Sequence, residues 1–385
     1  MKYRNFGKLD WEASLLGFGA MRLPRTGTDR TDIDEPEATR LLRYAIDHGV
    51  NYLDSAYRYH SGNSERILGR ILQDGYREKV KLTTKLPSRD IEAVQDFDWF
   101  LNEQLERLQT EKLDFYILHA MDRYLWPKVR DFGVLRWAEE KMAQGKFDHL
   151  GFSFHDNYEI FKEIVDAYDN WTLAQIQYNY MDADVSHRGP GRRGVEYAAD
   201  KGLALVIMEP LRGGNLAKKP PEQVAKIFEA AVDKHTPAEW GLLWIWNQPE
   251  ISVVLSGMNT MEQVVENIAS ADNAQVGFLT PDELSLIKQV RQGYEKLSPI
   301  PCTGCNYCIP CPNGVKISSI FRIYNEMELY ENPGMGRNLY QEEGGLREEE
   351  RADHCFECGA CIEVCPQNIM VPEWLKRVHT LLGTD

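Results

Sequence analysis

The chain has 385 residues, of which 43% are hydrophobic and 27% charged, a composition typical of a water-soluble globular protein. Its formal net charge of −15 argues against a nucleic-acid partner, which would favour a basic surface. The N-terminal stretch has no apolar signal-peptide segment, and no run of about 18 uncharged apolar residues could span a membrane. We therefore expect a cytoplasmic protein without a membrane or nucleic-acid partner.

The first residues predict a hairpin and then a helix. RNFGKLDWEAS contains a short hairpin signal around Gly7 and Lys8. PEATRLLRYAIDHG predicts a helix, with Pro36 near its first turn and Gly49 just past its end. A chain of this length is expected to form one large domain and a smaller one.

Short apolar runs then alternate with amphipathic stretches of helical spacing. This alternation is typical of parallel strands with covering helices, and eight such units indicate an α/β fold, a (β/α)8 TIM barrel. Two amphipathic helices follow the eighth run, and Thr280 with Glu283 forms a capping pattern for the second. The eight runs are Leu15–Met21, Tyr52–Ser55, Val80–Leu86, Leu113–Ala120, His149–Phe154, Ala174–Asn179, Ala204–Pro210 and Ile251–Met258.

Ionisable side chains occur near the ends of three consecutive runs. Asp54 and Tyr59 belong to the first, Lys85 to the second and His119 to the third. Each alone has an ordinary explanation, such as a helix cap for Asp54. In a parallel barrel, however, the C-terminal strand ends share one face. Together these residues predict a proton-donor site in which Tyr59 is the acid and Lys85, held by Asp54, lowers its pKa. His119 is placed to donate a hydrogen bond to a substrate carbonyl oxygen.

This set resembles the catalytic tetrad of the aldo/keto reductase family, in which Asp, Tyr, Lys and His occur in this order at strand ends. The resemblance extends over residues 1–297, which we expect to form the barrel domain. It implies that a small-molecule carbonyl is reduced or an alcohol oxidised. Because neither tyrosine nor lysine can supply a hydride, it also implies a nicotinamide cofactor, NADP or NAD.

The same resemblance implies cofactor contacts at the later strand ends. Ser153 and Gln177 correspond to side chains that bind the carboxamide, and PLRGGNL to the loop that covers the pyrophosphate. Glycines in this loop allow close backbone approach, and Arg212 can pair with a phosphate. Backbone N–H groups and a helix N-terminus in SGMNTMEQVVEN suit a phosphate. Glu266 and Asn267 in this stretch correspond to the residues that contact the adenine. The expected cofactor residues are Ser153, Gln177, Pro210, Leu211, Arg212, Gly213, Gly214, Ser256, Gly257, Met258, Gln263, Glu266 and Asn267.

Two features depart from the family pattern. Phe154 follows Ser153 where Asn is usual, and residues 252–266 contain no Lys or Arg, with Gln263 where Arg is often found. NADPH and NADH are therefore equal candidates. No flavin motif is recognisable, although barrels can bind a flavin phosphate without one. The basic stretch HRGPGRRG, residues 187–194, is interpreted as a solvated loop, with a clamp for a phosphate or an acidic substrate as the alternative.

All eight cysteines lie between Cys302 and Cys365, in two runs that each end in Cys-Pro. CFECGACIEVCP has the spacing of bacterial ferredoxins, and CTGCNYCIPCP differs by one residue before its last cysteine. Zinc is the alternative metal, but zinc sites usually lack the Cys-Pro tail. Disulfides are not expected in a cytoplasmic chain. The pattern therefore favours two 4Fe–4S clusters.

In the ferredoxin pattern the last cysteine of each run binds the cluster of the other run. The apolar helical spacing of ISSIFRIYNEMELY, between the runs, favours a small, mainly helical ferredoxin-like domain over residues 298–385. The expected ligands of one cluster are Cys302, Cys305, Cys308 and Cys365, and those of the other are Cys355, Cys358, Cys361 and Cys311.

Three functions remain open at this point. The first is an NAD(P)H-dependent interconversion of a carbonyl and an alcohol. The second is a ferredoxin-linked oxidoreductase, in which the clusters exchange electrons with the barrel site and a ferredoxin or another carrier is the partner. The third is a non-catalytic redox sensor, which the four tetrad residues argue against.

Overall fold

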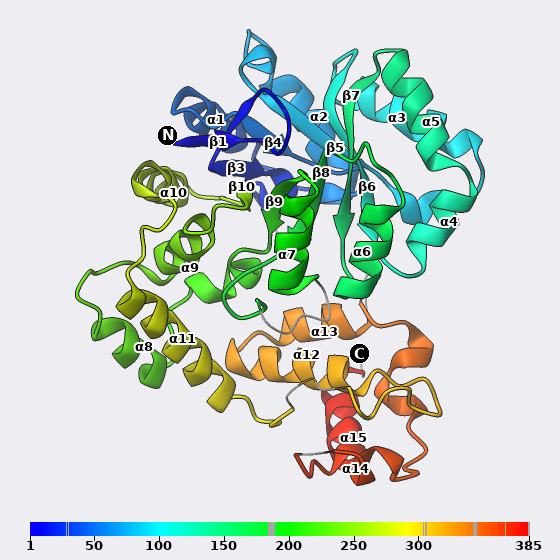
Figure 1. Ribbon diagram of the computed structural model, residues 1–385, viewed down its shortest axis with the longest axis vertical. Coiled ribbons are helices and arrows are strands. Elements are labelled where there is room, and N and C mark those ends of the chain that lie inside the picture. Colours follow the sequence, from blue (N-terminus) through cyan, green and yellow to red (C-terminus); the bar gives the residue numbers. More distant parts are fainter. Residues whose placement is uncertain are drawn as a thin grey trace. The chain divides into compact units, whose positions relative to one another are not determined.

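The computed structural model describes all 385 residues except 28, 30, 184–188, 303, 305, 342–344, 366 and 384–385. The chain divides into two compact units (Figure 1). Met1–Lys219 and Asp233–Leu284 form the first, and Pro220–Val232 and Ser285–Asp385 form the second. The boundary near residue 297 stays a prediction. Among the described residues, no helix is both long and apolar enough to cross a bilayer.

The first unit is built on a closed barrel of eight parallel strands, in the order β10-β3-β4-β5-β6-β7-β8-β9. Every predicted apolar run overlaps one of these strands, which confirms the (β/α)8 barrel. The strands are β3 (Leu16–Gly19), β4 (Tyr52–Asp54), β5 (Lys81–Leu86), β6 (Leu113–Met121), β7 (Phe147–Phe154), β8 (Leu173–Gln177), β9 (Ala204–Met208) and β10 (Ile251–Ser256).

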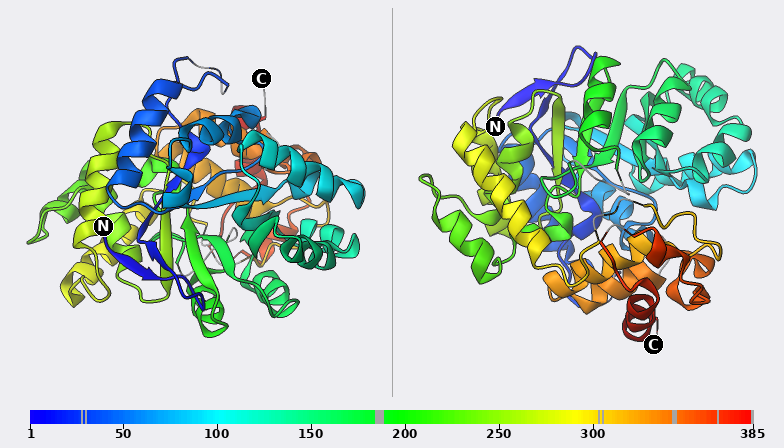
Figure 2. Two further views of the ribbon diagram at one scale, coloured as in Figure 1. Left: turned by 90° about the horizontal axis from the view of Figure 1, so that it is seen from above. Right: turned by 60° about the horizontal axis from the view of Figure 1, so that its bottom comes forward.

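Figures 1 and 2 both show helices covering the outside of the ring of strands. Helix α1 shows why they form: Asp34 caps its first turn by accepting from Glu37 N, and buried apolar residues recur along one face. The helices of this unit are α1 (Glu35–Asp47), α2 (Asn63–Ile71), α3 (Gln95–Arg107), α4 (Leu125–Asp131), α5 (Val134–Ala143), α6 (Tyr158–Asp166), α7 (Gly191–Asp200), α9 (Pro237–Trp246) and α10 (Met261–Asn273).

The N-terminal hairpin closes one end of the barrel. Strands β1 (Tyr3–Asn5) and β2 (Glu12–Ser14) pair antiparallel, as predicted. Phe6 in the hairpin stacks its ring against Tyr52 and Phe115, with centroids 5.6 and 4.9 Å apart. Inward side chains of β4, β6, β8, β9 and β10 join the same buried cluster. The C-terminal ends of the strands lie at the opposite end of the barrel, where the catalytic residues are predicted.

The second unit is mainly helical. Helix α11 begins in the first unit and continues into the second, and it starts with the predicted capping pattern, because Thr280 and Glu283 exchange backbone and side-chain hydrogen bonds. The core of the unit lies between α12 and α15, and six cysteines pack against it. The helices are α8 (Glu222–Glu229), α11 (Pro281–Lys296), α12 (Ile317–Leu329), α13 (Pro333–Gln341), α14 (Ala360–Glu363) and α15 (Val371–Leu382).

Candidate active site

The structure brings the four predicted catalytic side chains together at the C-terminal ends of β4, β5 and β6. Lys85 Nζ donates to both carboxylate oxygens of Asp54, at 2.7 Å each, and to Ser55 O at 2.7 Å. The Tyr59 hydroxyl lies 3.3 Å from the same nitrogen. The Tyr59 and His119 rings meet edge to face, with centroids 6.2 Å apart. A buried cation therefore connects a carboxylate to a phenol that a histidine faces.

Burial and the close partner act in opposite directions on the pKa of Lys85 and on that of Asp54. Burial lowers the pKa of Lys85, but the charge of Asp54 and its contact with Tyr59 outweigh this, and the pKa is raised overall. Burial raises the pKa of the Asp54 carboxyl, which Lys85 and, more weakly, the Gln175 amide oppose. At neutral pH Lys85 therefore remains a positive charge beside Tyr59.

The pKa of Tyr59 differs from the expectation in its net direction. Burial raises it, Lys85 lowers it, and Asp54 raises it, so that the phenol ends above its ordinary value. Lys85 thus acts in the predicted sense, but removal of the phenol from water has the larger effect. Tyr59 is accordingly protonated at neutral pH and available as a proton donor.

His119 is neutral at neutral pH. Burial lowers its pKa well below the usual value, and Lys85, His155 and two arginines lower it further. A neutral imidazole keeps one N–H, which can donate a hydrogen bond to an oxygen that gains negative charge. This arrangement agrees with the predicted role of His119 toward a carbonyl oxygen.

A left-handed turn follows Tyr59. His60, Ser61 and Gly62 have φ values of 52°, 55° and 92°. Such a conformation costs about 1–2 kcal/mol for each non-glycine residue, so the surroundings must hold it. His60 Nε2 accepts a hydrogen bond from Leu23 N at 3.1 Å, which ties the turn to the segment after β3. The proton donor therefore sits at the start of a strained turn.

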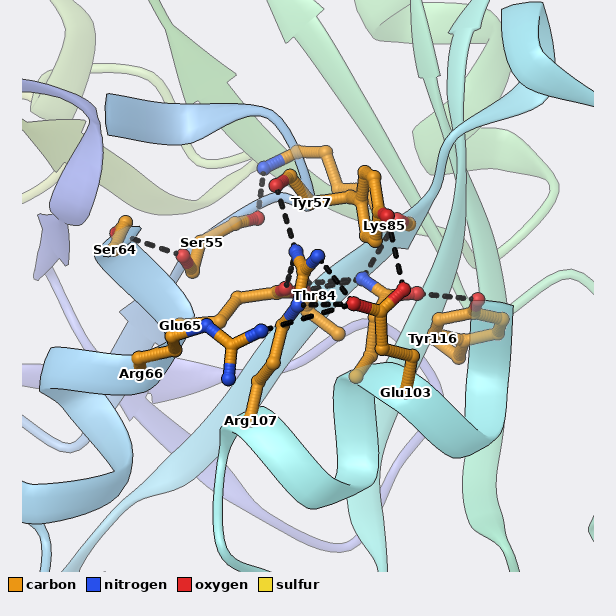
Figure 3. A network of polar contacts seen from close by, with 11 residues as sticks. Ser55, Tyr57, Ser64, Glu65, Arg66, Thr84, Lys85, Glu103, Arg107 and Tyr116 are labelled. Carbon is orange, nitrogen blue, oxygen red and sulfur yellow. Dashed lines mark hydrogen bonds and ion pairs between the residues drawn. The ribbon is translucent and has the colours of Figure 1, made fainter. Parts of the chain in front are cut away.

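Behind this turn lies a buried polar network, drawn in Figure 3. Glu65 on α2 accepts hydrogen bonds from the Thr84 hydroxyl at 2.6 Å and from Gln104 Nε2 at 2.5 Å. Gln104 Nε2 also donates to Lys85 O at 3.1 Å, and Gln104 Oε1 accepts from Tyr116. The main chain of Lys85 is thus linked to a carboxylate that has no solvent exposure.

Arg107 extends the network to the loop before Tyr59. Its Nη1 donates to Tyr57 O at 3.3 Å and to Glu65 at 3.4 Å. Its other nitrogens bind Glu103, which accepts a further hydrogen bond from the Tyr57 hydroxyl. The guanidinium also stacks on the Tyr57 ring, 4.0 Å from the centroid. Sequence reasoning missed this network.

Of the two expected carboxamide ligands, Ser153 points into the barrel end. Its hydroxyl accepts from Ala120 N at 2.7 Å. Gln177 donates to Asp182 at 3.3 Å. Gln175, which sequence reasoning missed, faces inward two residues earlier, paired in register with Ser153. Its Oε1 is buried without a hydrogen-bond partner among the described residues. Residues two apart on a strand share one face, so the sequence indicated that Gln175 and Gln177 lie on the same side but not which of them lies level with Ser153.

The loop after β9 contains the expected pyrophosphate segment. Gly213 and Gly214 have φ of 68° and 91°, and no atom of the described residues lies within 4 Å of a Cβ built on Gly214. Pro210 and Leu211 are buried beside them. Arg212 makes a two-pronged ion pair with Asp182, so its guanidinium is engaged by a carboxylate in this structure. The phosphate contact predicted for Arg212 stays a prediction.

Arg22, after β3, joins two of these loops. It pairs with Glu209 at 3.2 Å, and a Cβ on Gly213 would lie 3.2 Å from its Nη2. A Cβ on Gly257 would lie 3.2 Å from the Cβ of Arg22. Sequence reasoning missed Arg22 too, although its position just after a strand end was a sign that it lies near the site.

The remaining cofactor residues lie on the β10–α10 connection. Thr260 caps α10 by accepting from Gln263 N, and Gln263 Oε1 accepts from Asn259 N at 2.9 Å. Asn267 donates to the Ser256 hydroxyl at 3.0 Å. Gly257 and Met258 connect the strand to the helix, and Glu266 accepts from Thr236. The unpartnered Gln175 oxygen, the open space at Gly214 and this helix N-terminus fit a nicotinamide nucleotide.

The basic stretch 187–194 is only partly a loop. Residues 187 and 188 lie outside the described residues, but Gly191 to Gly194 form the first turn of α7. Arg192 pairs with Glu250 at 2.6 Å and with Glu196 at 2.8 Å. The solvated-loop interpretation is therefore wrong for these four residues.

In the second unit the cysteines fall into two groups. Cys302, Cys308 and Cys365 line one pocket together with apolar side chains of α12 and α15. Burial raises the pKa of Cys361, and Cys355, Cys358 and Cys311 add to the shift from nearby. Each group thus combines thiols from both runs. Cys305 lies outside the described residues.

These groups suit a cluster better than a single ion. Among the described residues, no three His, Cys, Asp or Glu side chains converge closely enough to hold one metal ion. A cubane distributes its four thiolates over four iron atoms, so it requires no such convergence. The mixed origin of each group matches the crossed assignment, which stays a prediction.

Comparisons with known proteins agree with this geometry. The Aldo/keto reductase family profile matches residues 15–292, and that of a 4Fe-4S dicluster domain matches residues 301–370. The "Uncharacterized oxidoreductase YrpG" of Bacillus subtilis (strain 168) is 24% identical over 343 residues, covering 78% of this chain and 97% of its own. "Probable aldo-keto reductase 1" of Glycine max is 25% identical over 298 residues, covering 69% and 82%.

The fold of this chain is also similar to that of a solved aldo-keto reductase structure. The holo form of aldo-keto reductase AKR11C1 from Bacillus halodurans superposes with a TM-score of 0.62 at 25% identity, over 75% of this chain and 96% of that one. The family profile spans most of the barrel unit and the dicluster profile spans both cysteine runs. The chain therefore belongs to the aldo/keto reductase family, as an oxidoreductase with a C-terminal 4Fe–4S dicluster domain.

Proposed function

We propose that the barrel interconverts a carbonyl and an alcohol with NADPH or NADH. One observation carries this proposal: buried Lys85 contacts both Asp54 and the Tyr59 hydroxyl, while neutral His119 faces the same phenol. This is the arrangement that general-acid catalysis at a carbonyl oxygen requires.

The chain's own residues account for binding and proton transfer. Ser153, Gln175 and Gln177 would hold the nicotinamide end, the Pro210–Gly214 loop and the β10–α10 connection the phosphates, and Glu266 with Asn267 the adenine. When bound, the reduced nicotinamide supplies a hydride to the carbonyl carbon.

Tyr59 completes the reduction at oxygen. His119 donates a hydrogen bond to the carbonyl oxygen, where negative charge develops. Tyr59 transfers its proton to that oxygen, which yields the alcohol and leaves a tyrosinate. Lys85 stabilises the tyrosinate by its charge and is itself held by Asp54. In the reverse direction the tyrosinate accepts the alcohol proton.

We further propose that the C-terminal unit binds two 4Fe–4S clusters with crossed ligands. Cys302, Cys305, Cys308 and Cys365 would hold one, and Cys355, Cys358, Cys361 and Cys311 the other. The supporting observation is that each group of neighbouring thiols combines both runs. Since such clusters carry single electrons, a ferredoxin-linked reaction at the barrel site is the second candidate function.

The test of the first candidate is Tyr59→Phe. Because this change removes the phenol that transfers its proton to the carbonyl oxygen, turnover with any accepted aldehyde should fall at least about a hundredfold. Nicotinamide binding, followed by fluorescence quenching, should persist. Tyr3→Phe, which removes an exposed hydroxyl bonded to Gly49 O, serves as the control. Normal turnover by Tyr59→Phe would show that the proposed function is wrong.

A further inference from the structure

The mechanism above gives no role to a fully buried carboxylate near the site, that of Glu65. Glu65 has no solvent exposure and lies six residues after Tyr59, on the first turns of α2. A carboxylate is expensive to bury unless it is fully hydrogen-bonded. Its neighbours should therefore indicate what Glu65 does.

Glu65 is held entirely by hydrogen-bond donors. The Thr84 hydroxyl and Gln104 Nε2 bind one oxygen, and Arg107 Nη1 approaches the other at 3.4 Å. Thr84, Gln104 and Arg107 are buried as well. Figure 3 shows Glu65, Thr84 and Arg107 converging from α2, β5 and α3. Burial raises the pKa of Glu65 above its ordinary value, although the hydrogen bonds from Thr84 and Gln104 and the charge of Arg107 oppose the rise. Glu65 thus joins three elements at one point.

Two of these partners continue to the proton-donor site. Gln104 Nε2 donates to the main-chain oxygen of Lys85, and so links Glu65 to the strand that carries the catalytic amine. Arg107 Nη1 donates to Tyr57 O, two residues before the phenol. The same Nη1 lies 3.2 Å from where a Cβ of Gly62 would be. The clamp formed by Glu65, Gln104 and Arg107 therefore contacts both sides of the Tyr59–Lys85 pair.

The turn at residues 60–62 needs such support. Three consecutive residues have positive φ, a conformation that persists only where the surroundings enforce it. We propose that Glu65 and Arg107 are positioning residues that hold this turn and thereby keep the Tyr59 hydroxyl against Lys85. The proposal rests on the proposed function of Tyr59, but its main test requires no substrate.

The test compares Glu65→Gln with Asp114→Asn. Asp114 is a matched control, since it is a buried carboxylate at the opposite end of the barrel that accepts from Arg77, Lys81 and Leu82 N. Both variants lose a buried charge and should lose stability. Only Glu65→Gln should change the site. Arg107→Lys, which keeps the charge but loses the forked geometry, is the second variant in case Glu65→Gln does not fold.

The main measurement is the pKa of Tyr59. It is followed by NMR of protein labelled at tyrosine Cζ, with the resonance assigned from its absence in Tyr59→Phe. Lys85 and Arg22 lower this pKa and Asp54 raises it. Loss of the Glu65 charge alone would favour the tyrosinate and lower the pKa. Loosening of the Tyr59–Lys85 contact would raise it. The two explanations therefore predict opposite signs.

We expect the pKa of Tyr59 to rise in Glu65→Gln and in Arg107→Lys, and to stay constant in Asp114→Asn. In steady-state assays kcat should fall about tenfold in the first two, with the KM for the nicotinamide nearly unchanged. An unchanged or lower pKa in either clamp variant, or a rise in Asp114→Asn as well, overturns the proposal. If Tyr59→Phe kept full turnover, the proposed function would fail while the titration still decided the positioning role.

Discussion

His119 links the chemistry of the site to the acid stability of the fold. Its pKa is lowered well below the usual value near 6.5 by burial, Lys85 and His155. The unfolded chain therefore binds a proton that the folded chain does not, in the window from about pH 6.5 down to the folded pKa. Stability should fall as the pH falls through this window, by at most about 1.4 kcal/mol per pH unit from this group.

His119→Gln should remove this dependence. We expect its free energy of unfolding, from urea titrations, to change less between pH 7 and pH 5 than that of the parent. His48→Gln, an exposed change on the barrel surface, should keep the parental slope. Equal slopes for His119→Gln and the parent would contradict the lowered pKa.

Single residues could be predicted where their position relative to an apolar run fixes where they lie in the barrel. The tetrad was predictable because each member follows an apolar run, and parallel strands end on one face. The choice between Gln175 and Gln177 was not, because both face inward and only the register with β7 gives their depth. Glu65 could not be predicted either, because Thr84 and Gln104 reach it from other elements.

At the scale of elements, the N-terminal hairpin is held to the barrel by the buried ring of Phe6. Phe6 has no solvent exposure and its ring contacts Trp11, Tyr52 and Phe115. Phe6→Ala should lower the free energy of unfolding by about 3–5 kcal/mol, because it leaves a cavity at the closed end. Trp99→Ala, at a 56% exposed position on α3, should cost far less.

The same variant tests how far the two ends of the barrel depend on each other. The polar site lies at the C-terminal strand ends and the hairpin at the other, so kcat of folded Phe6→Ala should remain close to the parent. Urea unfolding followed by circular dichroism, together with turnover below the unfolding midpoint, measures both. A large loss of kcat in folded protein would show that the hairpin also shapes the site.

Helices and strands could be predicted where the hydrophobic periodicity agreed with the residues that begin or end an element. Apolar runs bounded by helical stretches located all eight barrel strands. The start of α7 was not predictable, because Gly191 and Gly194 favour a loop locally. Tertiary contacts favour the helix instead, because Arg192 binds Glu250 and Gln248, which lie more than 50 residues away in the sequence. The Thr280–Glu283 cap, by contrast, is local and was correct.

At the scale of the whole molecule, the chain combines a cysteine-free barrel with a unit that contains every thiol. If ligation is crossed, Cys365→Ser should deplete the cluster of the distant run, Cys302 to Cys308, more than the neighbouring one. Cys361→Ser should deplete the other cluster. Iron analysis and EPR of the dithionite-reduced variants distinguish them. Selective loss of the cluster at Cys355 to Cys361 in Cys365→Ser would show that each run binds its own.

The left-handed turn after Tyr59 also limits which sequences this protein can adopt there. Branched side chains at Cβ clash with their own backbone at positive φ, which excludes Val, Ile and Thr from positions 60 and 61. The choice of residue at position 62 is more restricted still, because any Cβ there would also lie close to Arg107. Asn, Asp and Gly are the tolerated replacements for the first two, and Gly alone suits the third. We therefore expect few substitutions to be tolerated at these three consecutive residues, which follow the proton donor directly.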